Sequence, residues 1–201
     1  MNAAETPRCF LALEVSEAVR QKARELQQVL RRTDAVLRLP RPEDLHLTLV
    51  FLGETPAAEC PPLAELMDGV ARFHEPFTLH LKGVSVFGPP ARPRVVWAAV
   101  KPCPPLMRLQ QVLAEGVARL GHAIEVRAFA PHLTLARVDS IGNDRSLTSA
   151  LASITDSDLG EQPVSRILLM RSGLKSDTSR YTSLHLSPLK GTSAHAPESC
   201  Q

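Results

Sequence analysis

The sequence lacks the features that would send the protein into a membrane or along the secretory pathway. No apolar run approaches the roughly 20 residues that a membrane-spanning helix needs. A signal peptide starts with a positively charged segment that is followed by an apolar segment, and residues 1–5 do not fit this pattern. We therefore predict a cytoplasmic protein.

Other absences narrow the chemistry. No glycine-rich phosphate loop is present, which argues against a P-loop or dinucleotide-binding fold. The four cysteines include no Cys-x-x-Cys pair, so we expect buried or idle thiols rather than a zinc knuckle or a disulfide framework. The net charge is only +2, whereas a long duplex footprint would normally bring a stronger basic excess. Small nucleotides or RNA ends therefore fit better as anionic partners.

What the chain does have is enough apolar sequence for one medium domain or two small lobes. It contains 201 residues, of which 44% are hydrophobic and 22% charged, as in ordinary globular proteins. The last residues are rich in serine, alanine and proline. We therefore predict a single bilobal domain over residues 1–190 and a disordered tail over residues 191–201.

The most informative feature is the tetrapeptide His-Leu-Thr-Leu, which occurs at residues 46–49 and again at residues 132–135. Side chains alternate between the two faces of a strand, so the histidine and threonine of each copy point one way and the leucines point into the core. Leucine can recur for packing, but histidine and threonine have no packing reason to recur in register. We interpret each copy as a strand that presents one imidazole and one hydroxyl on the same side.

A helix followed by one of these strands occurs once in each half of the chain. The spacing of apolar residues predicts strands over residues 9–15, 45–52, 77–86, 95–100, 124–127, 132–138, 164–171 and 181–186. It predicts helices over residues 17–31, 61–70, 104–120 and 146–153. This order predicts an α+β protein of two similar lobes whose sheets line a central cleft.

Two imidazoles that face each other favour acid–base catalysis. One neutral ring takes a proton from a nucleophile while the other, protonated, gives a proton to a leaving group. Thr48 and Thr134 are placed to donate hydrogen bonds to phosphate oxygens, although threonine is also common in strands for its β-propensity alone. Metal binding by His46 and His132 is the rival interpretation. Neither strand offers a Cys, Asp or Glu on the same face as its histidine, so we predict no metal site.

The fifth residue after each histidine is harder to place. Arg137 is suited to bind phosphate through its guanidinium, but strict alternation puts it on the face opposite His132, so a bulge or twist would be needed. The alternative is a solvated cation at the end of the strand. Phe51 has the same offset from His46, and we expect it in the core rather than stacked on a base.

These motifs resemble those of the two-histidine phosphoesterase superfamily, which is defined by two His-x-Thr-x sequences. Within it, the chain is most similar to the bacterial and archaeal RNA 2′,3′-cyclic phosphodiesterases, also called 2′-5′ RNA ligases. The similarity runs to about Leu189 through Phe10-Leu-Ala-Leu, Leu45-His-Leu-Thr-Leu-Val-Phe-Leu-Gly-Glu54, Val95-Val-Trp97, Phe129-Ala-Pro-His-Leu-Thr-Leu-Ala-Arg137 and Arg180-Tyr-Thr182.

The resemblance implies two pseudo-symmetric lobes of antiparallel sheet with outer helices around a V-shaped cleft. It implies hydrolysis of a 2′,3′-cyclic phosphate to the 2′-phosphate without metal, ATP or another cofactor, and the related 2′-5′ ligation of RNA ends. His46 would be the proton donor to the leaving 3′ oxygen, and His132 would be the proton acceptor that activates water. The phosphate-binding residues would be Thr48, Thr134 and Arg137.

Two other classes of function remain open. One is a non-catalytic RNA-end binding module, which would need neither histidine to titrate. The other is a metal-dependent phosphohydrolase, which a chelator would expose. The expected partners are RNA ends or nucleotides that carry a 2′,3′-cyclic phosphate, with no membrane and no obligate protein partner.

Overall fold

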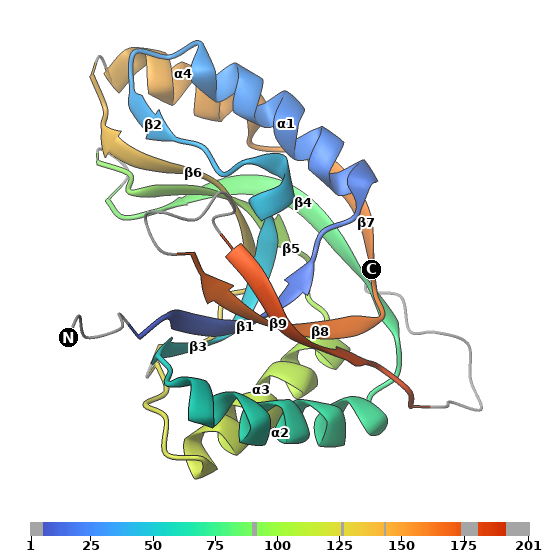
Figure 1. Cartoon of the computed structure of the whole chain (residues 1–201). Coiled ribbons are helices and arrows are strands. Elements are labelled where there is room, and N and C mark those ends of the chain that lie inside the picture. Colours follow the sequence, from blue (N-terminus) through green and yellow to red (C-terminus); the bar gives the residue numbers. More distant parts are fainter. Residues whose placement is uncertain (1–5, 90–91, 126, 143, 174–180, 192–201) are drawn as a thin grey trace, which may run out of the picture.

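A single antiparallel sheet forms the centre of the molecule in the computed structural model (Figure 1), which describes residues 6–89, 92–125, 127–142, 144–173 and 181–191. The strands are β1 (Arg8–Glu14), β2 (Val36–Arg38), β3 (His46–Glu54), β4 (Phe77–Phe87), β5 (Val95–Val100), β6 (His132–Ser140), β7 (Asp158–Val164), β8 (Arg166–Ser172) and β9 (Tyr181–Pro188). The helices are α1 (Glu17–Arg31), α2 (Cys60–Arg72), α3 (Pro104–Arg119) and α4 (Asp144–Ile154), with short 3₁₀ turns η1 (Pro42–Asp44) and η2 (Ala57–Glu59).

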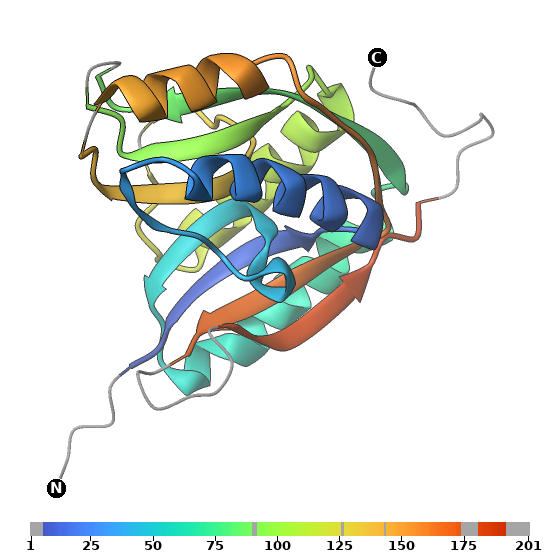
Figure 2. The same cartoon turned by 90° about the horizontal axis from the view of Figure 1, so that it is seen from above.

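The sheet divides between β3 and β6 into two lobes with matching strand orders. The first lobe runs outward as β3, β1, β8 and β9, and the second runs outward as β6, β5, β4 and β7, with β2 also paired to β6. In Figures 1 and 2, α2 and α3 cover the first lobe while α1 and α4 cover the second. The expected α+β fold of two pseudo-symmetric antiparallel lobes with outer helices is confirmed.

The helices are exchanged between the lobes relative to the order of the sequence. Helix α1 precedes the first motif strand, β3, yet it packs on β6 and β7 of the second lobe. Helix α3 precedes the second motif strand, β6, yet it packs on β3 of the first lobe. Each lobe is therefore assembled from both halves of the chain.

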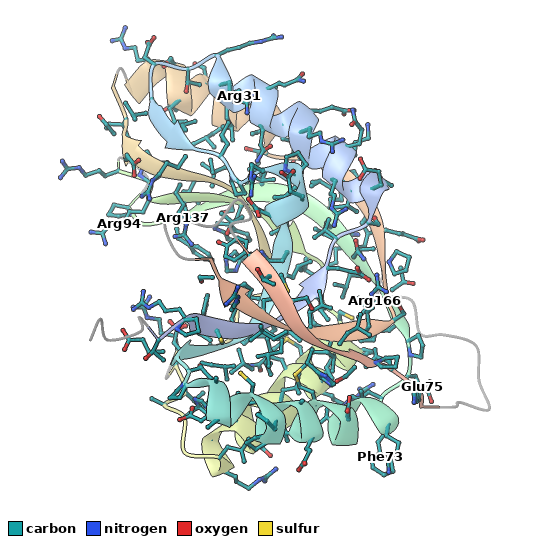
Figure 3. All side chains as sticks on the ribbon, viewed as in Figure 1. Arg31, Phe73, Glu75, Arg94, Arg137 and Arg166 are labelled. Carbon is teal, nitrogen blue, oxygen red and sulfur yellow. The ribbon has the colours of Figure 1, made fainter. Side chains whose placement is uncertain are left out.

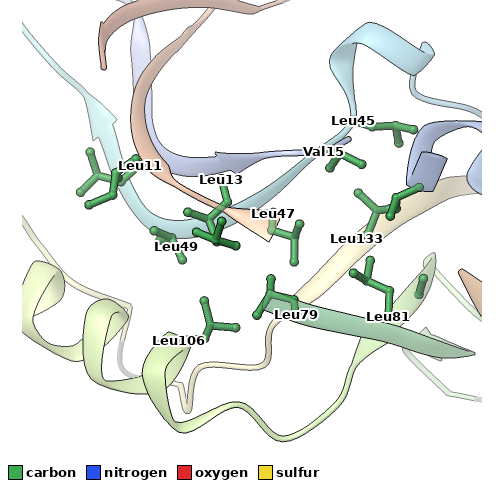
Figure 4. Packing of buried hydrophobic residues seen from close by; sticks show 14 of the residues in the cluster. Leu11, Leu13, Val15, Leu45, Leu47, Leu49, Leu79, Leu81, Leu106 and Leu133 are labelled. Carbon is green, nitrogen blue, oxygen red and sulfur yellow. The ribbon is translucent and has the colours of Figure 1, made fainter. Parts of the chain in front are cut away.

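The leucines of both motifs lie in the core, as the alternation predicts. Leu47, Leu49, Leu133 and Leu135 are at most 3% exposed. Figure 4 shows Leu47 and Leu133 among the leucines of neighbouring strands, with Leu106 of α3 below them. Burying each such side chain contributes about 1.5–3 kcal/mol, so the junction of the two motif strands is among the best-anchored parts of the fold.

Local sequence signals explain where two of the helices begin and end. The side-chain oxygen of Ser16 accepts a hydrogen bond from the backbone N–H of Val19 at 3.4 Å, which caps α1. Gly121 adopts a φ of 93° just after α3, a left-handed conformation that glycine enters without steric cost. Both signals are readable in the sequence.

Two strand predictions need correction. No strand includes Ile124, Glu125 or Arg127, which lie in the connection between α3 and β6 and take no part in the pairing of the strands that flank β6. Strand β7 was not predicted, because Gly160 and Pro163 interrupt its apolar pattern. It lies at an edge of the sheet, where proline is tolerated.

Backbone hydrogen bonds hold the chain against α2 up to the start of the predicted tail. The backbone N–H groups of Lys190 and Gly191 donate to the carbonyls of Ala71 and His74, each at 3.0 Å, at the end of α2. Residues 192–201 lie outside the described residues, so the prediction of a disordered tail stays untested there.

Two further expectations concern thiols and membranes. Cys9 and Cys60 are free thiols, and the side chains of Cys9 and Cys103 are buried. Across the part of the chain that the structure describes, none of the helices is long and apolar enough to cross a membrane.

Candidate active site

The two motif strands lie side by side and run in opposite directions. Leu47 of β3 pairs with Leu133 of β6 in antiparallel register. On the opposite face of the same pairing, His46 lies beside Thr134 and Thr48 lies beside His132. The two histidines are then diagonal neighbours. Residues in this relation on an antiparallel pair of strands lie roughly 7–8 Å apart. A phosphate group fits between two imidazoles at that spacing.

Both histidines line one cavity of about 450 Å³ between the lobes. Thr48, Thr134 and Arg137 line the same cavity, so it brings together all five residues that the sequence predicts for the site. A second hollow of about 700 Å³ opens beside it and shares His132 and Arg137, but His46 is not among its lining residues. The site therefore has free space on the His132 side.

Each imidazole is held by a backbone carbonyl two residues before it. Nδ1 of His46 lies 2.7 Å from the carbonyl oxygen of Asp44, and Nδ1 of His132 lies 2.8 Å from that of Ala130. A carbonyl can only accept, so Nδ1 must carry the proton and donate it. This leaves Nε2 of each ring as the atom that can accept or give a proton in chemistry.

Aromatic rings surround His46. Its imidazole stacks on Phe10 with 4.8 Å between ring centroids, and the ring of Tyr181 meets it edge-on at 4.9 Å. Burial lowers the pKa of His46 below its usual value, and the hydrogen bond to the Asp44 carbonyl opposes this only in part. In the absence of a ligand, the neutral ring is therefore favoured.

A different pair of rings lies beside His132. Phe87 and Trp97 stack on each other at 4.7 Å, and Phe87 meets the imidazole edge-on at 4.9 Å. The centroid of Trp97 lies 5.9 Å from that of His132. These contacts fix the plane of the second imidazole from the side of β4 and β5.

A one-residue bulge on β6 places Arg137 on the site face. Between Thr134 and Ala136 the register of β6 advances by two residues while β5 advances by one, so Leu135 is an extra residue. The bulge shifts the alternation, and Arg137 reaches the cavity that holds Thr134. The bulge that this position requires is therefore present, and phosphate binding by Arg137 stays a prediction.

Strand β3 carries the same bulge at the equivalent place. Its register against β1 advances by two residues between Thr48 and Val50, so Leu49 is the extra residue. Phe51 consequently lines the cavity and is 56% exposed. The expectation that Phe51 lies in the core is wrong, because strict alternation does not survive the bulge.

The cations of the cavity differ in how far they are neutralised. Arg38 forms a two-pronged ion pair with Asp139, with N–O distances of 2.7–3.0 Å. Arg137 forms no ion pair with any described residue, and it lines both hollows. Figure 3 shows Arg137 and Arg94 on the same side of the molecule. Arg137 is thus better placed than Arg38 to meet an anion.

Sequence reasoning passed over Phe10, although a signal was present. Leu11, Leu13 and Val15 alternate on the buried face of β1, which puts Phe10 on the other face, where the site lies. Tyr181, which belongs to the last of the segments that carry the family resemblance, also lines the cavity. Its position depends on the pairing of β8 with β9, which the sequence alone does not give.

The acidic residue nearest to either motif histidine in sequence is already paired. The carboxylate of Asp44 is buried and accepts a hydrogen bond from Nε of Arg41 at 2.9 Å. Among the described residues, no group of three or more His, Cys, Asp or Glu side chains is arranged to hold a metal ion. Independence from metal stays a prediction.

Comparison with known proteins assigns the chain to a family. A family model described as LigT-like phosphoesterase matches residues 13–97. An RNA 2′,3′-cyclic phosphodiesterase of Thermus thermophilus is 34% identical over 200 residues, covering 96% of this chain and 95% of the relative. One of Methanothermobacter thermautotrophicus is 30% identical over 179 residues, covering 89% and 97%. The chain belongs to the LigT-like phosphoesterase family.

Solved structures agree with this membership. The crystal structure of TT0787 of Thermus thermophilus has a TM-score of 0.79 and 32% identity, covering 92% of this chain and 98% of that one. The structure of Escherichia coli LigT complexed with 3′-AMP has a TM-score of 0.73 and 28% identity, covering 91% and 98%. The bilobal arrangement is thus that of the family.

Proposed function

We propose that this phosphoesterase opens 2′,3′-cyclic phosphates at RNA or nucleoside ends and leaves the 2′-phosphate. One observation carries the proposal: two histidines on paired strands, each with Nδ1 committed to a carbonyl, share one cavity. Relatives that cover nearly the whole chain are named for this activity. The alternatives, a non-catalytic RNA-end binding module and a metal-dependent phosphohydrolase, give different outcomes in the test below.

The proposed reaction moves one proton at each imidazole. Nε2 of His132 takes a proton from water as the water oxygen attacks phosphorus. The bond from phosphorus to the 3′ oxygen breaks, and that oxygen takes the proton from Nε2 of His46. The product is the 2′-phosphate, and each proton transfer contributes about 10²- to 10⁴-fold to the rate.

The proton donor role of His46 depends on the substrate. Burial lowers its pKa in the free protein, which disfavours the protonated ring that a donor needs. A bound phosphate anion stabilises the imidazolium and raises this pKa again. Binding of the anion thus favours the protonated form of His46, which is the form that a proton donor needs.

The phosphate oxygens would be held by Thr48, Thr134 and Arg137. The two hydroxyls flank the histidines on the paired strands, and the guanidinium lies at the wall shared by both hollows. Donors fixed before the reaction stabilise the charge of the pentacoordinate transition state without having to reorganise.

The second hollow favours the related 2′-5′ ligation as a further activity. It borders His132, which activates the nucleophile, and it is not lined by His46, which serves the leaving group. With a volume of about 700 Å³ it has room for a nucleoside that offers a 5′-hydroxyl in place of water. The same two proton transfers then run with a different nucleophile.

The remaining features of the proposal concern the setting of the reaction. We place the protein in the cytoplasm, acting on RNA ends or nucleotides, without an obligate protein partner and without a cofactor. These points rest on the sequence and on the proposed chemistry, because both protons are handled by side chains of this chain.

The deciding experiment incubates the protein with a nucleoside 2′,3′-cyclic phosphate in excess chelator and identifies the phosphate isomer. The proposal predicts hydrolysis to the 2′-phosphate. Release of the 3′-phosphate would overturn the assignment of the leaving group. Activity lost in chelator and restored by zinc or manganese would favour the metal-dependent alternative. Binding without turnover would favour the binding module.

A further inference from the structure

Each catalytic strand has a bulge whose extra residue needs a partner for its backbone. The extra residues, Leu49 and Leu135, are 3% and 0% exposed. A bulge takes its extra residue out of the strand ladder, and a buried carbonyl without a donor costs about 1–3 kcal/mol. The structure therefore has to supply a donor at both places.

A glutamine side chain supplies that donor in both lobes. Nε2 of Gln27, on α1, donates to the carbonyl of Leu135 at 3.0 Å. Nε2 of Gln110, on α3, donates to the carbonyl of Leu49 at 3.5 Å, a longer and weaker contact. The two contacts are equivalent in the pseudo-symmetry of the lobes, since Leu49 and Leu135 occupy the same place in the two motifs.

The two contacts are crossed, because the helices are exchanged between the lobes. Gln27 precedes the first motif in sequence but binds the strand of the second. Its other amide hydrogen goes to the carbonyl of Pro40, at 2.9 Å, in the segment that leads to His46. The buried side-chain amide of Gln27 thus connects the segment that precedes His46 with the bulge that follows His132.

The cost of burying this amide points to a role beyond helix packing. Gln27 is 4% exposed and lies beside the apolar stripe of α1, where an apolar side chain would be the ordinary choice. Both of its amide hydrogens are used, and the two acceptors belong to segments that carry different catalytic histidines.

We infer that Gln27 is a positioning residue that sets the placement of His46 relative to His132, with Gln110 as its weaker counterpart. This inference rests on the proposed function. Gln27 touches no reacting atom. It acts by fixing the bulge that brings Arg137 onto the site face and by holding the segment before His46 against the same point.

The main test compares Gln27→Met, which keeps the length of the side chain but removes both donors, with the wild type. We expect kcat for a nucleoside 2′,3′-cyclic phosphate to fall by roughly 10- to 100-fold, because a displacement of about 1 Å costs that much. Gln28→Met, at the exposed neighbouring position, should keep wild-type kcat. Leu26→Ala, a core variant of the same helix, measures what destabilisation alone does.

A second variant gives a readout that a purely structural role would not produce. In Gln27→Glu the carboxyl group faces two carbonyl oxygens, so its pKa is raised and the neutral acid can still donate one hydrogen bond. The kcat of this variant, divided by that of the wild type, should fall as pH rises and the carboxylate forms. The same ratio for Gln27→Met should not change with pH.

The outcomes separate this inference from the function on which it rests. If the wild type does not hydrolyse the cyclic phosphate, the proposed function fails. If the wild type is active and folded Gln27→Met matches it, the positioning role is wrong. The role is also wrong if Gln27→Met loses no more kcat than Leu26→Ala at equal loss of Tm. Should Gln27→Met not fold, a pH-independent ratio for Gln27→Glu overturns the inference.

Discussion

The two motif strands share four residues and a bulge, yet their surroundings differ. His46 stacks on Phe10 and has a lowered pKa, whereas His132 lies beside the stacked pair of Phe87 and Trp97. The fifth residue is Phe51 on one strand and a cation on the other. A repeated backbone device thus supports unequal side-chain chemistry, which a reaction with one donor and one acceptor requires.

The carbonyls that orient the two imidazoles are also held differently. The carbonyl that orients His46 belongs to Asp44, the last residue of the turn η1. The side-chain carboxylate of Asp44 is buried and forms an ion pair with Arg41. The carbonyl of Ala130 precedes Pro131, whose ring fixes φ and removes a donor. An ion pair on one side and a proline on the other give the same hydrogen bond, so the orientation of the ring is shared while its support is not.

Replacing either histidine should have the largest effect on activity. His46→Ala and His132→Ala should each lower kcat by roughly 100- to 10,000-fold, since each loses one proton transfer. The double variant should be little worse than either single one, because the two groups act in one step. Steady-state rates on folded variants check this. Near-wild-type turnover in either single variant would mean that the two-histidine mechanism is wrong.

Exchange of the fifth residues sharpens the contrast between the strands. Arg137→Ala should lower kcat/KM by roughly 10- to 100-fold, because a hydrogen bond to a charged group contributes about 1.5–3 kcal/mol. Phe51→Ala, at the matched position, removes no charge and should cost less. Arg137→Lys should recover part of the loss. Equal losses for Arg137→Ala and Phe51→Ala would argue that the cation is a solvated strand end.

Stability should depend on pH through His46 in a defined direction. Its folded-state pKa lies below the unfolded value of about 6.5, so its contribution is present above pH ~6.5 and is lost as pH falls through the folded pKa. Lowering the pH from 7 to 5 should therefore reduce Tm more in the wild type than in His46→Gln. Melting curves at several pH values measure this. Parallel curves for the two proteins would contradict the lowered pKa.

Removal of the tail should have the smallest effect. A chain that ends at Gly191 keeps the hydrogen bonds that Lys190 and Gly191 make to the end of α2. The removed residues show no periodic apolar pattern, so we expect Tm and kcat to match the full chain. A loss of several degrees in Tm would show that the tail packs on the domain.

The two His-Leu-Thr-Leu strands could be predicted from the sequence alone, because their pattern is repeated. The doubled tetrapeptide predicted two strands with inward leucines, and Leu47 and Leu133 are buried where those strands meet. Ser16 and Gly121 are sequence signals for where one helix begins and another ends, because each acts through local conformation alone.

The parts that failed depend on pairing between distant segments. A bulge is defined by the neighbouring strand, so the outward position of Phe51 could not follow from alternation alone. Strand β7 has an interrupted pattern and forms by pairing with β4 at an edge. The contact of Gln27 with Leu135 joins residues 108 positions apart, and a single glutamine on an apolar stripe gives no sign of its partner.

The most direct test of the paired-imidazole mechanism is the pH dependence of kcat/KM for a nucleoside 2′,3′-cyclic phosphate. We predict a bell-shaped profile, falling at low pH when the acceptor is protonated and at high pH when the donor has lost its proton. The two limbs belong to the coupled pair, and each single histidine variant should abolish one limb in its residual activity. A flat profile from about pH 5 to 9 in the wild type would contradict the mechanism.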